Sequence, residues 1–256
     1  MPDSSQVSTF FLVLLRSLAF MLSGPLFSFG RIPAVFKIGF SFALAMVTFP
    51  LVALNTQVNI PGDAWGYGLA VVSETGFGLL LGVAVTIILN SIRMAGSFID
   101  FQIGFSMANL VDPVNNAQNT LLAQYLYLLA LVFWFLIDGH YSLITGLVNS
   151  YQIVPINAAS FNGSVAFALA KIFSGAFTIA LKVSAPVMAV LLMVDLTLGF
   201  LARTTPQINV FLTAFPVKIA VGLLTLSFLI PILGTMLRFL FNTIERDLYT
   251  LMKVQL

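Results

Sequence analysis

The sequence contains no cysteine and only one histidine among its 256 residues. Disulfide bonds, thiolate catalysis and cysteine-ligated metal sites are therefore excluded, and a metal site built on histidine is not expected. Charged residues are also scarce: they make up 8% of the chain, against about 25% in an average soluble domain. The 11 basic and 9 acidic residues are spread thinly along the chain, so they predict no basic surface for nucleic acid.

Apolar residues take the place of the missing charges. They make up 59% of the chain, and the mean hydropathy is +1.04. A soluble fold of this length has too little interior to bury so much apolar surface. The composition therefore argues against a soluble enzyme, a disordered chain or a nucleic-acid module, and it predicts a membrane protein. Residues 1–9 contain no Lys or Arg, so we expect no cleaved signal peptide.

Six apolar stretches can be marked along the chain. A bilayer crossing takes about 20 residues. The first four stretches fit one crossing each, whereas the last two are too long for one crossing and contain prolines. Helices there either kink at proline or project beyond the bilayer into a protein assembly. We therefore predict an all-α, polytopic membrane protein of long, kinked helices. The stretches cover residues 7–29, 34–54, 65–92, 121–137, 164–199 and 208–241.

The connections between these stretches predict an orientation. Residues 55–64 and 138–163 read as polar loops without Lys or Arg, whereas the other connections carry basic residues. The positive-inside rule puts the basic connections in the cytoplasm and the two polar loops outside. With six spans both termini would lie outside, which the basic residues near the C-terminus oppose. The cytoplasmic basic residues would be Arg31, Lys37, Arg93 and Arg203.

A stripe of small residues surrounds one carboxylate in the third stretch. Ala70, Glu74, Gly78 and Gly82 recur every four residues and share one face of a helix. Small side chains let another helix approach closely, and a carboxylate among them must face protein or water rather than lipid. We interpret this stripe as a subunit-packing groove with a satisfied carboxylate. A proton or ion relay is the alternative.

The segment after this stretch, residues 93–120, is the most unusual. Gly96, Asp100 and Gly104 continue the four-residue spacing, and we assign Gly96 and Asp100 to subunit packing as well. The Asp112-Pro113 pair ends any helix, because the residue before proline avoids the helical region. Irregular backbone at membrane depth survives only when it is buried in protein or lines water. A re-entrant or pore-lining loop fits, and an ordinary cytoplasmic connection is the alternative.

Isolated charges in the last two stretches need partners. Lys171 and Lys182 share one helix face, and Asp195 lies deep in an apolar run. Each needs an oppositely charged partner or a place near a helix end. The spacing predicts that Lys218 pairs with Asp195 across a hairpin that turns around Arg203, so Asp195 and Lys218 are the candidates for buried charges.

Catalytic motifs are absent from the sequence. It has no Gly-x-Ser-x-Gly, no His-Glu-x-x-His and no Gly-rich phosphate-binding loop. The sequence therefore predicts that the chain is not an enzyme and holds no cofactor. His140 follows an Asp-Gly pair at a predicted helix end, and we interpret it as a capping or interfacial residue rather than a proton switch.

Four patches follow one another in order across nearly the whole chain. They are Arg31-Ile-Pro33; Glu74-x-x-x-Gly78-x-x-x-Gly82; Ala95-Gly96-x-x-Ile99-Asp100-x-Gln102-x-Gly104-x-x-x-Ala108-x-x-x-Asp112-Pro113; and Leu198-Gly199-x-x-x-Arg203-x-x-Pro206-Gln207-Ile208-Asn209-Val210-Phe211, followed by Phe215-Pro216-x-Lys218. Together these patches resemble the FliR/SctT family of type III export gate subunits. The one departure is Ala214, where flagellar members commonly have glycine.

The resemblance implies an integral subunit of the flagellar protein export gate, through which unfolded flagellar subunits cross the bacterial inner membrane. It implies FliP, FliQ, FlhB and FlhA as partners, within the flagellar basal body and partly on the periplasmic side. Residues 1–160 would be FliP-like, and residues 161–256 a FliQ-like helical hairpin with a cytoplasmic turn at about 200–209. Residues 104–122 would form a plug that closes the pore from inside.

The site residues follow from the same resemblance. The plug or gate would comprise Gly104, Phe105, Ser106, Met107, Asn109, Leu110, Val111, Asp112 and Pro113. The cytoplasmic hairpin turn would comprise Arg203, Pro206, Gln207, Asn209 and Phe211. A virulence type III secretion subunit (SctT-like) is the alternative. A small-solute secondary transporter is a weaker one, since the sequence shows no two related halves.

Overall fold

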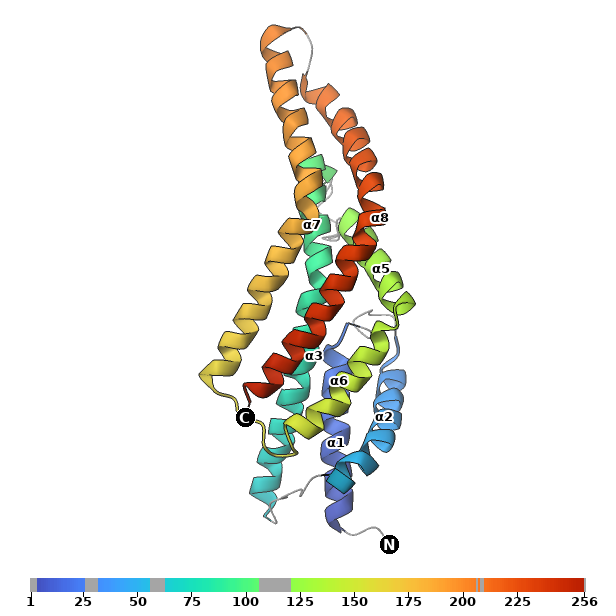
Figure 1. Cartoon of the computed structure of the whole chain (residues 1–256), viewed down its shortest axis with the longest axis vertical. Helices are drawn as coiled ribbons and strands as arrows, with labels where there is room; N and C mark the ends of the chain where they lie inside the picture. The colour runs from blue at the N-terminus through green and yellow to red at the C-terminus, as the bar shows by residue number, and fades with distance from the viewer. Residues whose placement is uncertain are drawn as a thin grey trace. The chain divides into compact units, whose positions relative to one another are not determined.

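The computed structural model describes residues 4–25, 32–55, 63–105, 121–205, 207 and 210–255. Within these residues the chain forms seven α-helices and no strand (Figure 1), so the predicted all-α class is confirmed. The helices are α1 (Ser4–Ser23), α2 (Ala34–Asn55), α3 (Ala64–Ile103), α5 (Leu121–Leu136), α6 (Gly139–Ile153), α7 (Gly163–Thr204) and α8 (Val210–Lys253).

The lengths and compositions of these helices fit a membrane. Among the described residues, α1, α2, α3, α7 and α8 are each long and apolar enough to cross a bilayer, and α5 with α6 meets the same criteria as a broken span. Helices α7 and α8 have 42 and 44 residues, which is about 60 Å each and roughly twice the thickness of the hydrocarbon core. The prediction of a polytopic membrane protein with long helices is confirmed.

Helix α3 is longer than the apolar stretch that predicts it. It continues for about three turns beyond residue 92 and ends at Ile103, so Gly96 and Asp100 belong to a regular helix rather than to a loop. The helix continues because Ala95, Ile99 and Ile103 keep the four-residue spacing of buried apolar side chains. It ends at Gly104, whose φ of 101° lies in the left-handed region that favours glycine.

The polar loop predicted for residues 138–163 is wrong for its first half, because residues 139–153 form α6. This helix buries Leu143, Leu147 and Tyr151 on one face, and most of its polar side chains lie on the other faces. Such an amphipathic helix has too low a mean hydropathy to be recognised as a membrane stretch. A break separates α6 from α5, and Asp138 adopts a left-handed φ of 59° there.

The chain divides into two compact units. Unit 1 comprises residues 1–88, 138–173 and 242–256, and unit 2 comprises residues 89–137 and 174–241. Helices α3, α7 and α8 contribute residues to both. These units describe packing within the chain, and the predicted resemblance of residues 1–160 and 161–256 to two kinds of subunit stays a prediction.

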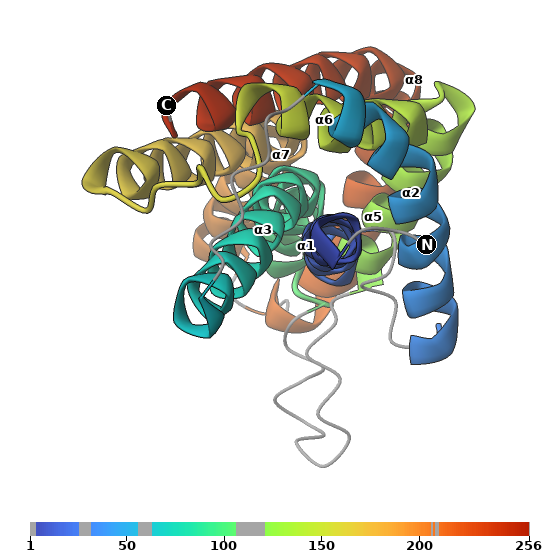
Figure 2. The ribbon, with the colours of Figure 1, turned by 90° about the horizontal axis from the view of Figure 1, so that it is seen from below.

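Unit 1 is built around α1. Viewed end on, α1 lies between α3 and α2, with α6 beside them (Figure 2). The ring of Phe10 in α1 makes edge-on contacts with Phe42 and Phe49 of α2, with ring centroids 5.6 Å apart in both pairs. On its other faces α1 buries Leu12 and Phe20. This packing lets the polar side chains of α1 reach α3 and α6.

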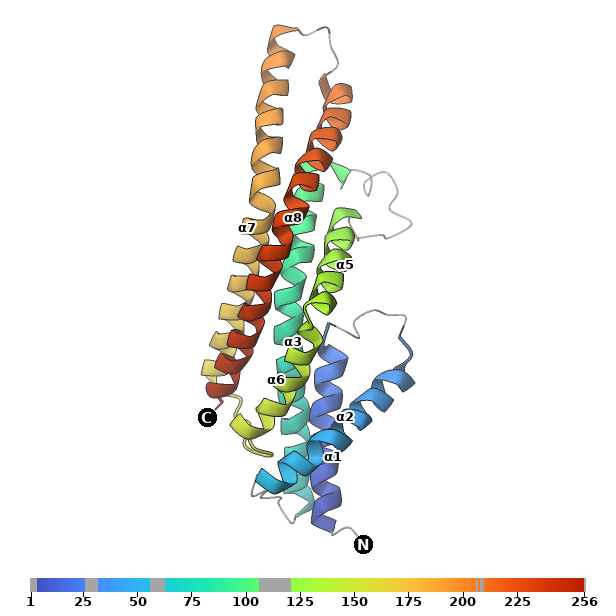
Figure 3. The ribbon, with the colours of Figure 1, turned by 45° about the vertical axis from the view of Figure 1, so that its right-hand side comes forward.

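Unit 2 combines the C-terminal part of α3 with α5 and most of the α7–α8 hairpin (Figure 3). Trp134 of α5 is 1% exposed, and its ring centroid lies 6.4 Å from that of Phe241 in α8. Phe98 of α3 makes an edge-on contact with Phe177 of α7. Aromatic contacts therefore join α5 to α8 and α3 to α7.

Candidate functional site

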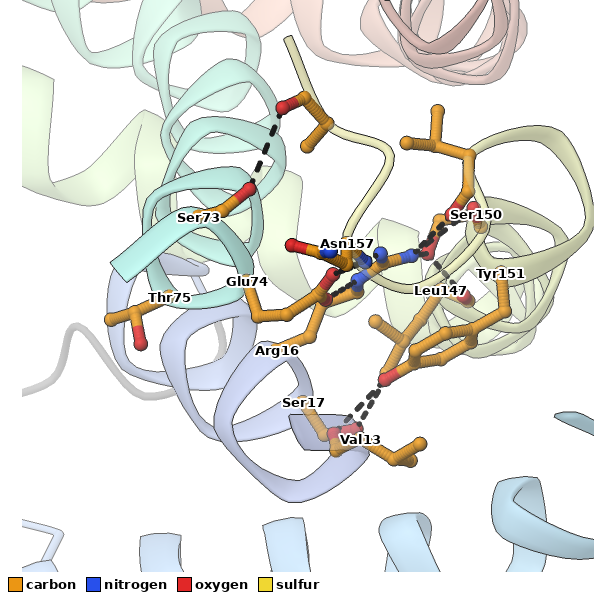
Figure 4. Close-up of polar contacts among 12 residues, drawn as sticks. Val13, Arg16, Ser17, Ser73, Glu74, Thr75, Leu147, Ser150, Tyr151 and Asn157 are labelled. Atoms are coloured by element: carbon orange, nitrogen blue, oxygen red, sulfur yellow. Dashed lines mark hydrogen bonds and ion pairs between the residues drawn. The ribbon is translucent and has the colours of Figure 1, made fainter. Parts of the chain in front are cut away.

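The most developed polar cluster lies in the interior of unit 1. Arg16 of α1 faces Glu74 of α3, and both side chains are 0% exposed (Figure 4). Arg16 Nε donates to Glu74 Oε2 over 2.6 Å, and Arg16 Nη2 donates to Glu74 Oε1 over 3.0 Å. This two-pronged geometry is the strongest form of an arginine–carboxylate pair. The carboxylate that the sequence singles out thus has a cationic partner in its own chain.

The remaining donors of Arg16 bind the C-terminal end of α6. Arg16 Nη1 donates to the carbonyl oxygen of Ser150 over 3.2 Å and to that of Val154 over 3.0 Å. The last carbonyl groups of a helix have no partner within the helix and carry partial negative charge. Arg16 therefore neutralises Glu74 and also closes the end of α6, so that one side chain ties together three helices.

Aromatic rings and a backbone amide complete this cluster. The guanidinium of Arg16 lies over the rings of Phe77 and Tyr151, 4.7 and 4.4 Å from their centroids. Glu74 Oε1 also accepts the backbone N–H of Asn157 over 2.9 Å. Glu74 thus accepts three hydrogen bonds, and the positive charge of Arg16 balances its negative charge. This geometry favours the satisfied-carboxylate interpretation of Glu74 over a relay.

Close helix approach brings these groups together. A Cβ atom at Gly78 would lie 2.9 Å from the Cβ of Ala19, and one at Gly82 would lie 2.6 Å from the carbonyl oxygen of Phe20. Both contacts are shorter than real side chains tolerate, so only glycine lets α1 lie this close to α3. Glu74, Gly78 and Gly82 therefore pack against α1 of the same chain, and their predicted role in packing between subunits stays a prediction.

The second part of the packing stripe serves α5 in unit 2. Asp100 is 0% exposed, and its carboxylate accepts the backbone N–H groups of Leu122 and Ala123 over 3.2 and 3.0 Å. These amides belong to the first turn of α5, where no helical carbonyl is available to them. A Cβ atom at Gly96 would lie 2.7 Å from the backbone nitrogen of Ala123. Gly96 and Asp100 therefore also pack a helix of the same chain.

The predicted pair of Lys218 and Asp195 occurs in unit 2. Lys218 Nζ forms an ion pair with Asp195 Oδ1, and Gln102 Nε2 donates to Asp195 Oδ2 over 3.0 Å. Asp195 therefore joins α3, α7 and α8. Within this chain the side chains are 37% exposed at Asp195 and 20% exposed at Lys218, and their burial in an assembly stays a prediction. The hairpin brings them to a surface within this chain.

The predicted plug is described only at its start. Gly104 ends α3, and a Cβ atom there would lie 2.8 Å from the ring of Phe215 in α8. Phe105 follows and is the last residue described before the gap at residues 106–120. The other predicted plug residues lie outside the described residues, so their role stays a prediction. These are Ser106, Met107, Asn109, Leu110, Val111, Asp112 and Pro113.

The predicted hairpin turn is likewise described in part. Arg203 lies in the last turn of α7 with an exposed side chain, and Gln207 is also exposed. Phe211 lies in the first turn of α8, and Pro206 and Asn209 lie outside the described residues. A turn between α7 and α8 at this position agrees with the sequence. Its placement in the cytoplasm stays a prediction.

The central residue of the unit 1 cluster, Arg16, was not identified by sequence reasoning. The available signal was its isolation, because Arg16 is the lone charged residue of the apolar run at residues 7–29. A lone cation in such a run needs an anion, and Glu74 is the lone anion of the run at residues 65–92. Asn157 carried no signal, since it contributes only its backbone amide.

Metal-binding groups are absent from this part of the molecule. Among residues 4–25, 32–55, 63–105, 121–205, 207 and 210–255, no three His, Cys, Asp or Glu side chains are placed to hold a metal ion. What the arrangement provides is precise helix placement in unit 1 and a partly exposed polar group at Asp195 in unit 2.

Comparison with known proteins gives a consistent result. Residues 7–244 match the family described as "Bacterial export proteins, family 1". The chain is 40% identical over 251 residues to the flagellar biosynthetic protein FliR of Bacillus subtilis, and the match covers 96% of both chains. It is 30% identical over 240 residues to FliR of Escherichia coli, covering 94% of this chain and 91% of that protein.

Proposed function

The chain belongs to the bacterial export proteins of family 1, and on that premise we propose that it is an integral subunit of the flagellar type III protein export gate. The observation that carries this proposal is the near full-length similarity to proteins named for flagellar biosynthesis in distant bacteria. The apolar helices support a place in the membrane. In this role the chain forms part of the pore for unfolded flagellar subunits in the inner membrane.

The proposed assembly contains FliP and FliQ, with FlhB and FlhA alongside. Two features of the chain support work within an assembly. Helices α7 and α8 are much longer than one crossing requires, and many of their large apolar side chains are exposed. Exposed examples are Phe167, Phe173, Phe200, Leu224, Phe228 and Phe239.

We place the pore plug at residues 104–122. Two features of the described residues support this position. Gly104 ends α3 with a conformation that redirects the backbone, and Asp100 holds the first amides of α5 where the chain returns. Gly104 and Asp100 both lie within the last two turns of α3 or just after it. The two ends of the proposed plug segment are therefore held next to the same helix end. Apolar residues in that segment would block water and ions at rest.

Gene deletion in the source organism tests the proposed function. Loss of the chain should abolish flagellar filaments and the release of flagellin into the medium, and the intact gene should restore both. Intact flagella after deletion would contradict the flagellar role and favour the virulence alternative. Solute uptake by vesicles that contain only this chain would favour a secondary transporter.

Deletion of residues 106–120 tests the plug. The complex should still assemble, since the anchors Asp100 and Gly104 remain, but membrane vesicles that contain it should leak ions. The intact complex in matched vesicles is the control. Normal assembly with unchanged conductance would assign the pore barrier to another part of the complex.

A further inference from the structure

Lys182 occupies an unusual place on α7. It lies close to the middle of this 42-residue apolar helix, and its side chain is exposed. None of the described residues forms an ion pair or a hydrogen bond with it. A lysine that faces lipid far from both helix ends is costly, so such residues normally face protein or water. The exposed cation therefore calls for a partner outside this chain.

Small side chains surround Lys182 on the same helix face. Thr178, Lys182, Ala185 and Ala189 are spaced by four, three and four residues, so they share one face of α7. All four are exposed. We call these four residues the Lys182 face. They lie within unit 2, in which α7 is the outermost helix and α8 and α3 pack on its other side (Figure 3).

A groove runs beside this face. Its volume is about 320 Å³. Its lining includes Ala185 and Ala189 together with Gln102 of α3. Near Lys182, a Cβ atom at Gly175 would meet nothing within 4 Å. The Lys182 face is thus exposed and lies beside a groove, which Leu181, Met188 and Leu192 also line.

Two other parts of the chain show what fills such a surface. Glu74 lies on a helix face with Gly78 and Gly82, and α1 packs there and supplies Arg16. Asp100 lies on a face with Gly96, and α5 packs there and supplies two amides. In both cases a close helix satisfies the ionised side chain. The Lys182 face likewise combines one charged residue with small ones, here threonine and alanine instead of glycine and with the opposite charge, and no helix of the described chain covers it.

We infer that the Lys182 face is the docking site for a membrane helix of another subunit that places an Asp or Glu carboxylate against Lys182. Charge complementarity selects the carboxylate, because only an anion offsets the cost of removing the ammonium group from water. The small residues select a helix, because they let two helix backbones approach closely. The inference rests on the proposed function, which gives the chain neighbouring membrane subunits.

Substitution of Lys182 in the intact complex, purified from membranes in mild detergent, separates the possible occupants. Lys182→Met keeps the side-chain length and removes the charge, so it should lower the yield of neighbouring subunits that copurify by about threefold or more. Lys182→Arg should retain them. A face that meets lipid predicts an unchanged or higher yield for Lys182→Met, and that result would overturn the inference.

Single-cysteine variants give an independent readout, because the chain has no cysteine of its own. In the assembled complex Ala185→Cys should resist a water-soluble maleimide, and it should react after the subunits are separated. Rapid labelling in the assembled complex would show that the face lines water, which also overturns the inference. Arg203→Cys, at an exposed helix end, is the control for reagent access.

These results are distinguishable from a failure of the proposed function. If gene deletion leaves flagella intact, the flagellar role fails whatever Lys182 contacts. If deletion abolishes flagella and Lys182→Met copurifies with its neighbours at the original yield, only the docking inference fails.

Discussion

Two ion pairs between helices in the described part of the chain, Arg16 with Glu74 and Lys218 with Asp195, differ in burial, and the difference separates two uses of charge. In unit 1, Arg16 and Glu74 are 0% exposed and have every strong donor and acceptor occupied by protein. In unit 2, Lys218 and Asp195 are 20% and 37% exposed. Water can replace either partner of the second pair but neither partner of the first. The buried pair therefore fixes helix positions, whereas the exposed pair can rearrange at low cost.

The largest expected effect comes from breaking the buried pair. Glu74→Ala leaves the Arg16 charge without an anion in a closed interior, so the free energy of unfolding should fall by about 3–5 kcal/mol. Thermal unfolding of the purified full chain in detergent measures this loss. Replacement of both charges by Arg16→Met with Glu74→Leu should cost less, because no charge is left unpaired. An equal loss in the single and double variants would contradict the assignment of the pair as a charge lock.

Close packing gives the next largest effect. Gly96→Leu would drive a side chain into the backbone of α5. A Cβ atom at position 96 would lie only 2.7 Å from the backbone nitrogen of Ala123. Because backbone cannot yield as a side chain does, we expect a loss of about 3 kcal/mol. Gly68→Leu on the same helix is the matched control, since nothing lies within 4 Å of its Cβ position. Similar stability of the two variants would show that α5 does not pack against Gly96.

The contact between Asp100 and α5 should matter less. Asp100→Ala leaves the amides of Leu122 and Ala123 buried without an acceptor, which costs about 1–3 kcal/mol. Hydrogen exchange at these two amides should become faster. Asp63→Ala is the control, because Asp63 accepts the N–H of Gly66 at an exposed helix start where water can substitute. Unchanged exchange at Leu122 and Ala123 would exclude Asp100 as their acceptor.

The exposed pair should give the smallest effect. A double-mutant cycle with Asp195→Ala and Lys218→Ala should yield a coupling of about 1 kcal/mol or less, as is usual for partly exposed ion pairs. Chemical unfolding of the four variants in detergent measures it. A coupling as large as that of Arg16 and Glu74 would contradict the difference between the two pairs. Zero coupling would show that Asp195 and Lys218 do not interact.

Much of the fold could be read from the sequence, because hydrophobic runs are local. The predicted stretches locate six helices, and most of the helix ends agree within a few residues. These helices are α1, α2, α3, α5, α7 and α8. Helix α6 was not predicted, because its buried face contains only a few apolar residues, such as Leu143 and Leu147. The polar residues between them lower the mean hydropathy of the segment. The end of α3 was missed because its small and polar residues lower hydropathy without breaking the helix.

The candidate site was predicted less completely. Spacing on one helix identified Glu74 and Asp100 as side chains that need partners. It could not identify Arg16, which is 58 residues away from Glu74, or the amides of α5. The stripe of glycines was correctly seen as a packing surface, but spacing does not tell whether the approaching helix comes from the same chain.

By itself the sequence determined that this is an all-α membrane protein with few charges, and which of those charges need partners. These properties follow from the composition of the chain and from the spacing of residues within a few turns of one helix. The tertiary structure alone decided that α1 and α5 fill the glycine stripes, that Arg16 joins Glu74 to the end of α6, and that the pair of Asp195 and Lys218 stays partly exposed. The reason is that burial and pairing depend on which helices meet, and that is settled by packing across the whole chain.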